Sequence, residues 1–135
     1  MKFVRSLLVL LTAVALSGCI FLPEPPPTTP SGTEAGPRPT NPRAVIADWA
    51  NSHYKYMVSS PFTPEEMAIS EPTPIVYHDA LLGRKIGWEV IIGPDTPRLS
   101  RVIEMDYTRF ILYRDGIISM VSSDRPFPEV RGPVR

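Results

Sequence analysis

The clearest amphipathic pattern in the chain lies in the stretch RAVIADWANSHYKYMV, residues 43–58. Apolar and aromatic side chains recur there at steps of three and four residues, the period of one face of an α-helix. These residues are Val45, Ile46, Trp49, His53, Tyr56 and Met57. The preceding Asn41-Pro42 suits a helix start, because asparagine caps free amides and proline fits the first turn. Since Ser-Ser-Pro follows at residues 59–61, the pattern predicts a helix over residues 43–58.

The C-terminal half changes to the alternation of apolar and polar residues that is typical of strands. A short run at residues 75–78 precedes RKIGWEVIIG, in which Ile86, Trp88, Val90 and Ile92 share one face. RVIEMDYTRFILY, residues 101–113, reads as a further strand with one apolar face. That face comprises Ile103, Met105, Tyr107, Ile111 and Tyr113.

A hairpin is predicted after this strand, because Arg114-Asp115-Gly116 leads directly into IISMVSS. Asp-Gly between two such runs is a strong hairpin signal, since both turn residues need positive φ. The runs together predict an antiparallel β meander whose apolar face receives the helix, which is an α+β fold.

Residues 61–74, PFTPEEMAISEPTP, connect the helix to the strands. Thr63 and Glu66 have the spacing of a capping box, and Pro64 suits a first helical position. Pro72 and Pro74 prevent a helix that begins at this capping box from continuing. We expect one short helical turn followed by an irregular crossing.

The N-terminus carries an apolar run, Leu7 to Leu16, preceded by Lys2 and Arg5 and followed by Ser-Gly-Cys. This is the order of a secretory signal, and the run is too short to cross a bilayer as a helix. Cys19 is the only cysteine of the 135 residues, so no disulfide within the chain is possible. We expect residues 1–18 to be a signal peptide.

Residues 20–42 are dominated by proline, which supplies eight of the 23 positions. Such a segment favours extended polyproline II and forms a semi-rigid spacer, with a reach of at most about 70 Å. A proline-rich ligand for a partner is the competing interpretation. The expected domains are therefore a signal peptide (1–18), the Cys19 segment and spacer (19–42), an α+β domain (43–124) and a flexible tail (125–135).

Charge excludes one class of partner. If the expected signal peptide, residues 1–18, is removed, only Lys2 and Arg5 of the 14 basic residues leave and all 14 acidic ones stay, so the net charge is near −2. That balance offers no electrostatic footprint for nucleic acid.

Candidate chemistry is sparse. His53 and His78 are the only histidines, and no Cys/His cluster suggests a metal site. His78 could in principle activate Ser59 or Ser60, but no serine-hydrolase signature accompanies them. We expect no enzyme activity, no metal and no cofactor.

Surface contacts are the remaining candidate sites. Tyr54 lies off the apolar stripe and is a possible partner contact. Arg84-Lys85 and Arg98 with Arg101 flank the same strand connection and could form a modest basic rim.

Leu16-Ser17-Gly18-Cys19 resembles the lipobox of bacterial lipoprotein precursors. The resemblance implies cleavage before Cys19 and acylation of its thiol, so that Cys19 becomes a lipid tether; two or three acyl chains hold a protein firmly at a membrane. An ordinary secretory signal with an incidental cysteine is the alternative. Ile20, rather than an aspartate, follows the cysteine, and by resemblance this implies the outer membrane, with the domain facing the periplasm.

The C-terminal half, GRKIGWEVIIG followed by RFILYRDGIISMV, resembles small proteobacterial envelope lipoproteins, among them the SmpA/OmlA type. Two functions remain open. One is a non-enzymatic accessory subunit that docks on a protein partner in an envelope assembly or secretion complex, and the other is a lipoprotein that binds a small ligand or the cell wall.

Overall fold

The computed structural model describes residues 26–130 except residues 32, 80 and 82. The expected signal peptide, Cys19 and the first residues of the spacer lie outside the described residues. Within the described part, an α-helix and a short 3-10 helix precede two strands, and a second α-helix precedes the last two strands. The elements are α2 (Pro42–Tyr54), η1 (Pro64–Glu66), β1 (Thr73–Asp79), β2 (Gly83–Ile92), α3 (Pro97–Ile103), β3 (Tyr107–Tyr113) and β4 (Gly116–Ser123).

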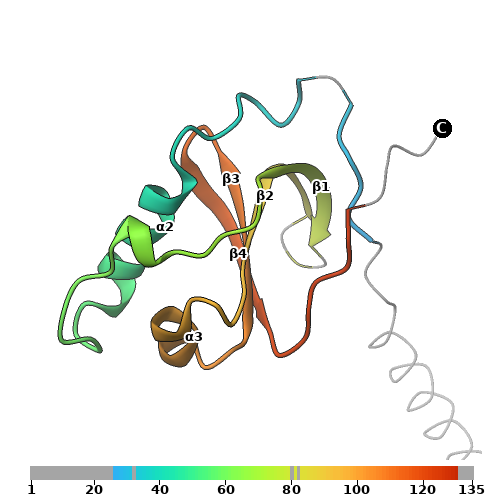
Figure 1. Cartoon of the computed structure of the whole chain (residues 1–135). Helices are drawn as coiled ribbons and strands as arrows, with labels where there is room; N and C mark the ends of the chain where they lie inside the picture. Colours follow the sequence, from blue (N-terminus) through green and yellow to red (C-terminus); the bar gives the residue numbers. More distant parts are fainter. Residues whose placement is uncertain (1–25, 32, 80, 82, 131–135) are drawn as a thin grey trace, which may run out of the picture.

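The four strands form one antiparallel sheet in the order β1-β2-β3-β4, which confirms the predicted meander and the α+β class. All the described helices lie on one side of the sheet (Figure 1). The main core lies between the sheet and these helices. Its buried apolar residues are Ile46, Ala47, Ala50, Phe62, Met67, Val90, Ile92, Leu99, Phe110 and Leu112.

The first helix ends earlier than the sequence pattern predicts. It stops at Tyr54 instead of residue 58, and Met57 donates its amide to the Tyr54 carbonyl in the turn that follows. The predicted start is confirmed, because the Asn41 side chain accepts the Ala44 amide and Pro42 lies in the first turn. The buried stripe runs through Ile46, Ala47 and Ala50, and it leaves Tyr56 and Met57 in solvent.

The predicted strand over residues 101–113 is wrong in its first half, because residues 97–103 form α3. Pro97 occupies the first turn, and Leu99, Val102 and Ile103 pack into the main core at helical spacing. Glu104 ends the helix in the left-handed conformation, with φ at 62°. The strand that follows begins only at Tyr107.

The face of β3 that packs on the helices is also the opposite of the expected one. Phe110 and Leu112 enter the main core, whereas Ile111 lies on the second face with Ile75 and Tyr77 of β1. Because both faces of β3 carry large apolar side chains, alternation alone did not distinguish them.

The predicted β3–β4 hairpin is present, but its turn is displaced by one residue. Arg114 and Asp115 have φ of 50° and 60°, and Gly116 pairs with Tyr113 as the first residue of β4. A register shift at Ile111/Leu112 adds a β-bulge on this pair of strands.

The described part of the predicted spacer lies against the sheet. Thr28 bridges the outer edge of β1 through two hydrogen bonds with Val76, of 3.0 and 2.6 Å. The Trp88 indole donates to the Gly36 carbonyl at 3.2 Å, and Ala35 is buried. The pairing of this segment with β1 differs from the picture of a spacer that holds the domain at a distance.

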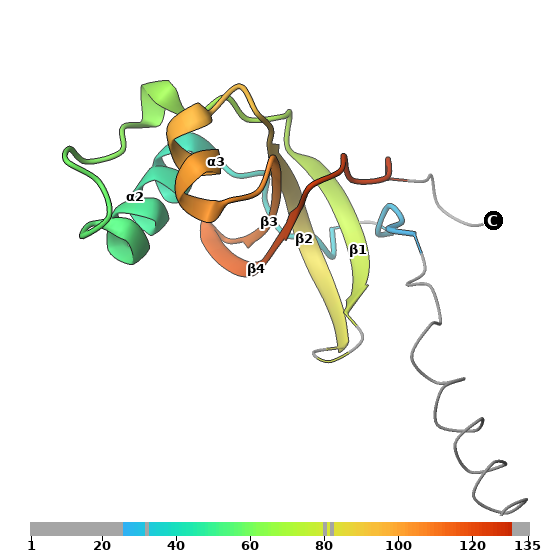
Figure 2. The ribbon, with the colours of Figure 1, turned by 90° about the horizontal axis from the view of Figure 1, so that it is seen from below.

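The described part of the predicted flexible tail also contacts the sheet. Val130 packs beside Ile75 and Tyr77 on the second face, and Phe127 lies on Arg109. The beginning of the described chain and this tail both run beside β1, away from the helices (Figure 2).

Candidate functional site

Residues 55–61, the first part of the segment that joins α2 to η1, project from the domain beyond the sheet (Figure 1). We call these residues the α2–η1 loop. Tyr56 is 90% exposed and Met57 is 66% exposed, so two large apolar side chains stand in solvent at adjacent positions. Exposed side chains of this size in a single loop are a candidate contact surface for a partner.

One end of the α2–η1 loop is held by Asn51 of α2. Its side-chain amide donates to the Phe62 carbonyl at 2.9 Å, and its side-chain oxygen accepts the Phe62 amide at 2.6 Å. The Phe62 ring is buried in the main core. This pair of hydrogen bonds ties the backbone directly after the loop to α2.

Arg98 of α3 holds the same end of the loop. One nitrogen of its guanidinium donates to both Glu66 carboxylate oxygens, at 3.0 and 2.8 Å, and the other donates to the Ser60 carbonyl at 2.7 Å. The guanidinium also lies over the Phe62 ring, 4.8 Å from its centre. Glu66 in turn accepts the Thr63 amide at 2.7 Å, as the predicted capping box requires.

Two hollows lie on either side of Val58 and Ser59. The first has a volume of about 300 Å³ and is lined by Asn51, Lys55, Val58, Ser59, Ser60 and Pro61. The second has a volume of about 210 Å³ and is lined by Met57, Val58, Ser59, Arg98, Arg101 and Val102.

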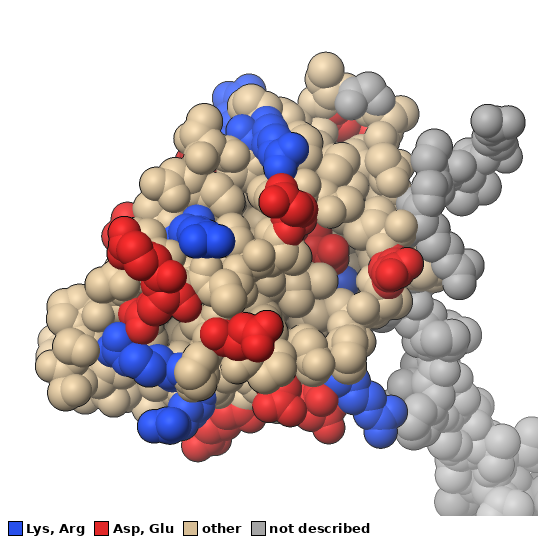
Figure 3. All heavy atoms as spheres, in the orientation of Figure 1, with Lys and Arg blue, Asp and Glu red and all other residues tan. Residues whose placement is uncertain are grey.

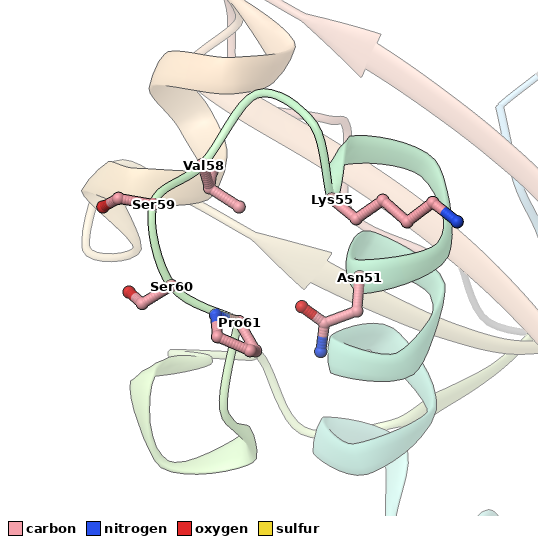
Figure 4. A pocket seen from close by; sticks show the side chains of 6 residues that line it. All are labelled: Asn51, Lys55, Val58, Ser59, Ser60 and Pro61. Carbon is pink, nitrogen blue, oxygen red and sulfur yellow. The ribbon is translucent and has the colours of Figure 1, made fainter.

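The polar groups around the first hollow do not converge on its centre. Val58 and Pro61 point inward, whereas the Ser59 and Ser60 hydroxyls and the Lys55 amine point away (Figure 4). The amide of Asn51 is already occupied by the Phe62 backbone. This hollow therefore suits an apolar side chain better than a polar ligand.

The structure places the predicted contact residues in different roles. Tyr54 is wrong as an exposed contact, because it is half-buried, packs on the core and meets the Trp49 ring edge-on at 5.6 Å. Arg98 is engaged with Glu66 and Ser60. Arg101 stays exposed at the second hollow.

The predicted basic rim does not form. Arg84 and Lys85 lie at the start of β2, whereas Arg98 and Arg101 follow its end, about 25 Å away at the rise of a strand. Arg84 lies 3.6 Å from Glu34, and positive and negative side chains are intermixed over the face shown in Figure 3. Tyr56 and Met57, which the helical period had assigned to the buried stripe, are the exposed side chains that the sequence pattern missed.

The two histidines contact residues other than the loop serines. His53 stacks on Trp49 with ring centres 4.6 Å apart, and His78 pairs in register with Arg84 at the far end of β2. Within residues 26–130, apart from the three undescribed positions, no three His, Cys, Asp or Glu side chains gather as metal ligands would. The same residues contain no helix of the length and apolarity needed to span a membrane.

A second unusual cluster lies on the face of the sheet away from the helices. Glu89 of β2 and Arg109 of β3 are 6% and 4% exposed, and their closest charged atoms are 3.7 Å apart. The Arg109 guanidinium lies between the Tyr77 and Phe127 rings, 4.2 and 4.7 Å from their centres. Burial raises the pKa of the Glu89 carboxyl above its ordinary value, and the neighbouring Arg109 charge opposes that rise.

Replacing Asn51 with alanine should remove both hydrogen bonds to Phe62 and lower the free energy of unfolding by about 2 kcal/mol. Urea unfolding measures the loss. The matched control is Ser52→Ala on the exposed side of α2, where the hydroxyl bonds only to the Asp48 carbonyl, and the free energy of unfolding should stay within about 0.5 kcal/mol. Equal stabilities for the two variants would show that the loop is not held through Asn51.

No protein-family model, no curated protein and no solved structure matches this chain.

Proposed function

We propose that this protein is a membrane-anchored envelope lipoprotein, a non-enzymatic accessory subunit that docks on a protein partner through the α2–η1 loop. The observation that carries the proposal is the exposure of Tyr56 and Met57 on a loop that continues directly from α2 and whose C-terminal end is held by Asn51 and Arg98. A loop that is already ordered loses little conformational entropy on binding, so its exposed side chains can contribute most of their burial to affinity.

The surroundings of the loop indicate the chemistry of the partner. Lys55 and Arg101 are exposed beside Tyr56 and Met57, and no carboxylate in the described part of the chain pairs with either cation. A protein surface with an apolar depression and carboxylates at its rim would complement this arrangement. The inward-pointing Val58 and Pro61 offer a reciprocal hollow for an apolar side chain of the partner.

The membrane anchor in this proposal is an acylated Cys19, supported by the lipobox pattern at residues 16–19. Eight residues, 20–27, lie between the proposed lipid on Cys19 and Thr28, which pairs with β1. Fully extended, they reach about 25 Å. The domain would thus stay close to the bilayer, and we propose the periplasmic side of the outer membrane as its location.

The anchor is tested by replacing Cys19 with serine in the full chain. We expect the variant to lose incorporation of a labelled fatty acid and to leave the membrane pellet after carbonate extraction, because the acyl chains have no other attachment point. Gradient fractionation of the wild type then distinguishes outer from inner membrane. Undiminished labelling of the variant would contradict the anchor.

Docking is tested with a photo-reactive amino acid at position 56, in intact cells that carry the full chain. We expect a cross-link to one envelope protein, and the change Met57→Glu should reduce its yield about tenfold because it puts a charge among apolar contacts. The control is the same probe at Asp48, exposed elsewhere on α2. Similar cross-linking at both positions, or indifference to Met57→Glu, would contradict docking through this loop.

A further inference from the structure

The two edges of the sheet are treated differently. The outer side of β1 is bridged by Thr28. For β4, the only pairing within the described residues is with β3, and no hydrogen bond from another described backbone reaches its outer side. β4 is therefore an open edge, eight residues long.

Hydrogen bonds elsewhere in the sheet show which groups of β4 point outward. Ile91 directs its amide and its carbonyl to Ser70, away from β3. Along an antiparallel ladder, pairs that exchange hydrogen bonds alternate with pairs that do not. Arg109, opposite Ile91, therefore directs its amide and carbonyl to β4. The next residue, Phe110, directs its amide and carbonyl to β2. Met120 pairs with Phe110, so the amide and carbonyl of Met120 face outward. Ser122 lies two residues further on, so its amide and carbonyl face outward as well.

The composition of β4 does not protect this edge. GIISMVSS contains no charged residue and no proline, which are the common means of preventing edge pairing. Ile118 is 39% exposed and lies in the bulged part of the strand. The bulge lies near the turn, and it leaves Ser119–Ser123 as a regular strand.

The charges at the two ends of β4 indicate what covers it. Arg114-Asp115 precedes the strand and Asp124-Arg125 follows it. A second copy that runs antiparallel, with Met120 opposite Met120, brings Asp115 of each copy toward Arg125 of the other. Opposite charges thus meet at both ends of a strand that carries no charge of its own.

We propose that β4 pairs with β4 of a second copy of this chain, in an antiparallel arrangement about a twofold axis near Met120. The two sheets then form one continuous eight-stranded sheet, with the helices of both copies on the same side. A twofold contact of this kind uses one patch twice and closes on itself, so it gives a dimer and not a filament. The inference is independent of the partner proposed for the α2–η1 loop, which lies on a different surface.

The experiment uses the full chain in intact bacteria, expressed as two copies with different tags and with a photo-reactive amino acid at position 118. We expect a cross-linked species that carries both tags and has twice the mass of one chain. The same probe at Arg101, which is exposed on α3, should give no such species. Absence of the doubly tagged species at position 118, or a cross-link there only to a different protein, would overturn the proposal.

Two variants test the edge itself. With the probe kept at position 118, Ser122→Pro removes an outward amide and should lower the yield of doubly tagged species about tenfold, whereas Ser122→Ala should leave the yield near that of the wild type. Both variants lose the contact between the Ser122 and Thr108 hydroxyls, so any loss of stability from that contact is the same in both. If Ser122→Pro fails to fold, moving the probe to Ser119 and introducing Ile118→Lys should produce the same loss, because a lysine at an exposed edge position opposes pairing. An unchanged yield in a folded variant would overturn the proposal.

Discussion

Replacing Arg109 with methionine should lower the free energy of unfolding by about 3–5 kcal/mol at pH 7. The guanidinium is buried between Tyr77 and Phe127, and it provides the charge that faces the buried Glu89 carboxylate. Methionine retains much of the volume but leaves the carboxylate without a counter-charge in an apolar surrounding. One Glu89 carboxylate oxygen already has no hydrogen-bond partner, so little compensation remains.

The effect should depend on pH in a defined direction. Burial raises the pKa of Glu89, so the folded protein binds this proton more tightly than the unfolded chain does. The associated stability is present below the ordinary pKa of a glutamate and is lost as the pH rises through the raised value. Without Arg109, the opposing effect of its charge disappears and the pKa rises further. The stability difference between wild type and Arg109→Met should thus be smaller near pH 4 than at pH 7.

A second substitution identifies the cause of the loss. Adding Glu89→Gln to Arg109→Met removes the unpaired charge, and most of the lost stability should return at pH 7 because a neutral side chain is cheaper to bury. Arg101→Met is the control for loss of an exposed arginine and should stay within about 0.5 kcal/mol of wild type. Urea unfolding between pH 4 and pH 7.5 measures all four proteins. A loss that is independent of pH and unaffected by Glu89→Gln would show that packing alone accounts for it.

Replacing Gly87 with alanine should lower the free energy of unfolding by about 2–3 kcal/mol. A Cβ at this position in β2 would meet the Leu112 carbonyl oxygen and lie 2.9 Å from the Ile111 side chain. The oxygen belongs to the neighbouring strand, so relief requires β2 and β3 to move apart rather than a side chain to rotate. Such a shift would disturb the ladder next to the buried Phe110 and Leu112.

Gly93→Ala is the matched control for Gly87→Ala. Its Cβ would lie 3.7 Å from the Tyr107 ring, an ordinary van der Waals distance, so the free energy of unfolding should change by about 0.5 kcal/mol or less. Thermal and urea unfolding of the two variants give the comparison. Equal losses would indicate that chain entropy, which both alanines alter alike, and not the contact with Leu112 determines the result.

Part of this architecture is predictable from local patterns. The start of α2 follows from Asn41 and Pro42, and the short helical turn follows from the Thr63–Glu66 capping box. The order of strands in the meander follows from alternation and from a tight turn near Asp115. In each case the signal lies within a few neighbouring residues, so no distant contact is needed to read it.

The site was less predictable, because its features depend on partners distant in sequence. Tyr56 and Met57 fit the helical period, but the helix ends before them while Asn51 binds Phe62. The sequence predicted Arg98 as part of a basic rim. In the fold it binds Glu66 and Ser60, which precede it by 32 and 38 residues in the chain. α3 does have a helical pattern in the sequence, Pro97 followed by Leu99, Val102 and Ile103. The alternating pattern after Arg101 led instead to the prediction of a strand over residues 101–113.

The sequence by itself thus determined the class of fold, the start of the first helix and the order of the strands, because short-range periodicity and turn chemistry specify them. Only the tertiary structure decided which face of β3 packs on the helices, since Phe110 and Ile111 lie on opposite faces and are both apolar and buried. It also paired Thr28 with β1, enclosed Glu89 with Arg109, and left the edge of β4 open. Burial and pairing are properties of surfaces brought together from distant parts of the chain, and periodicity along the chain carries no information about which surfaces will meet.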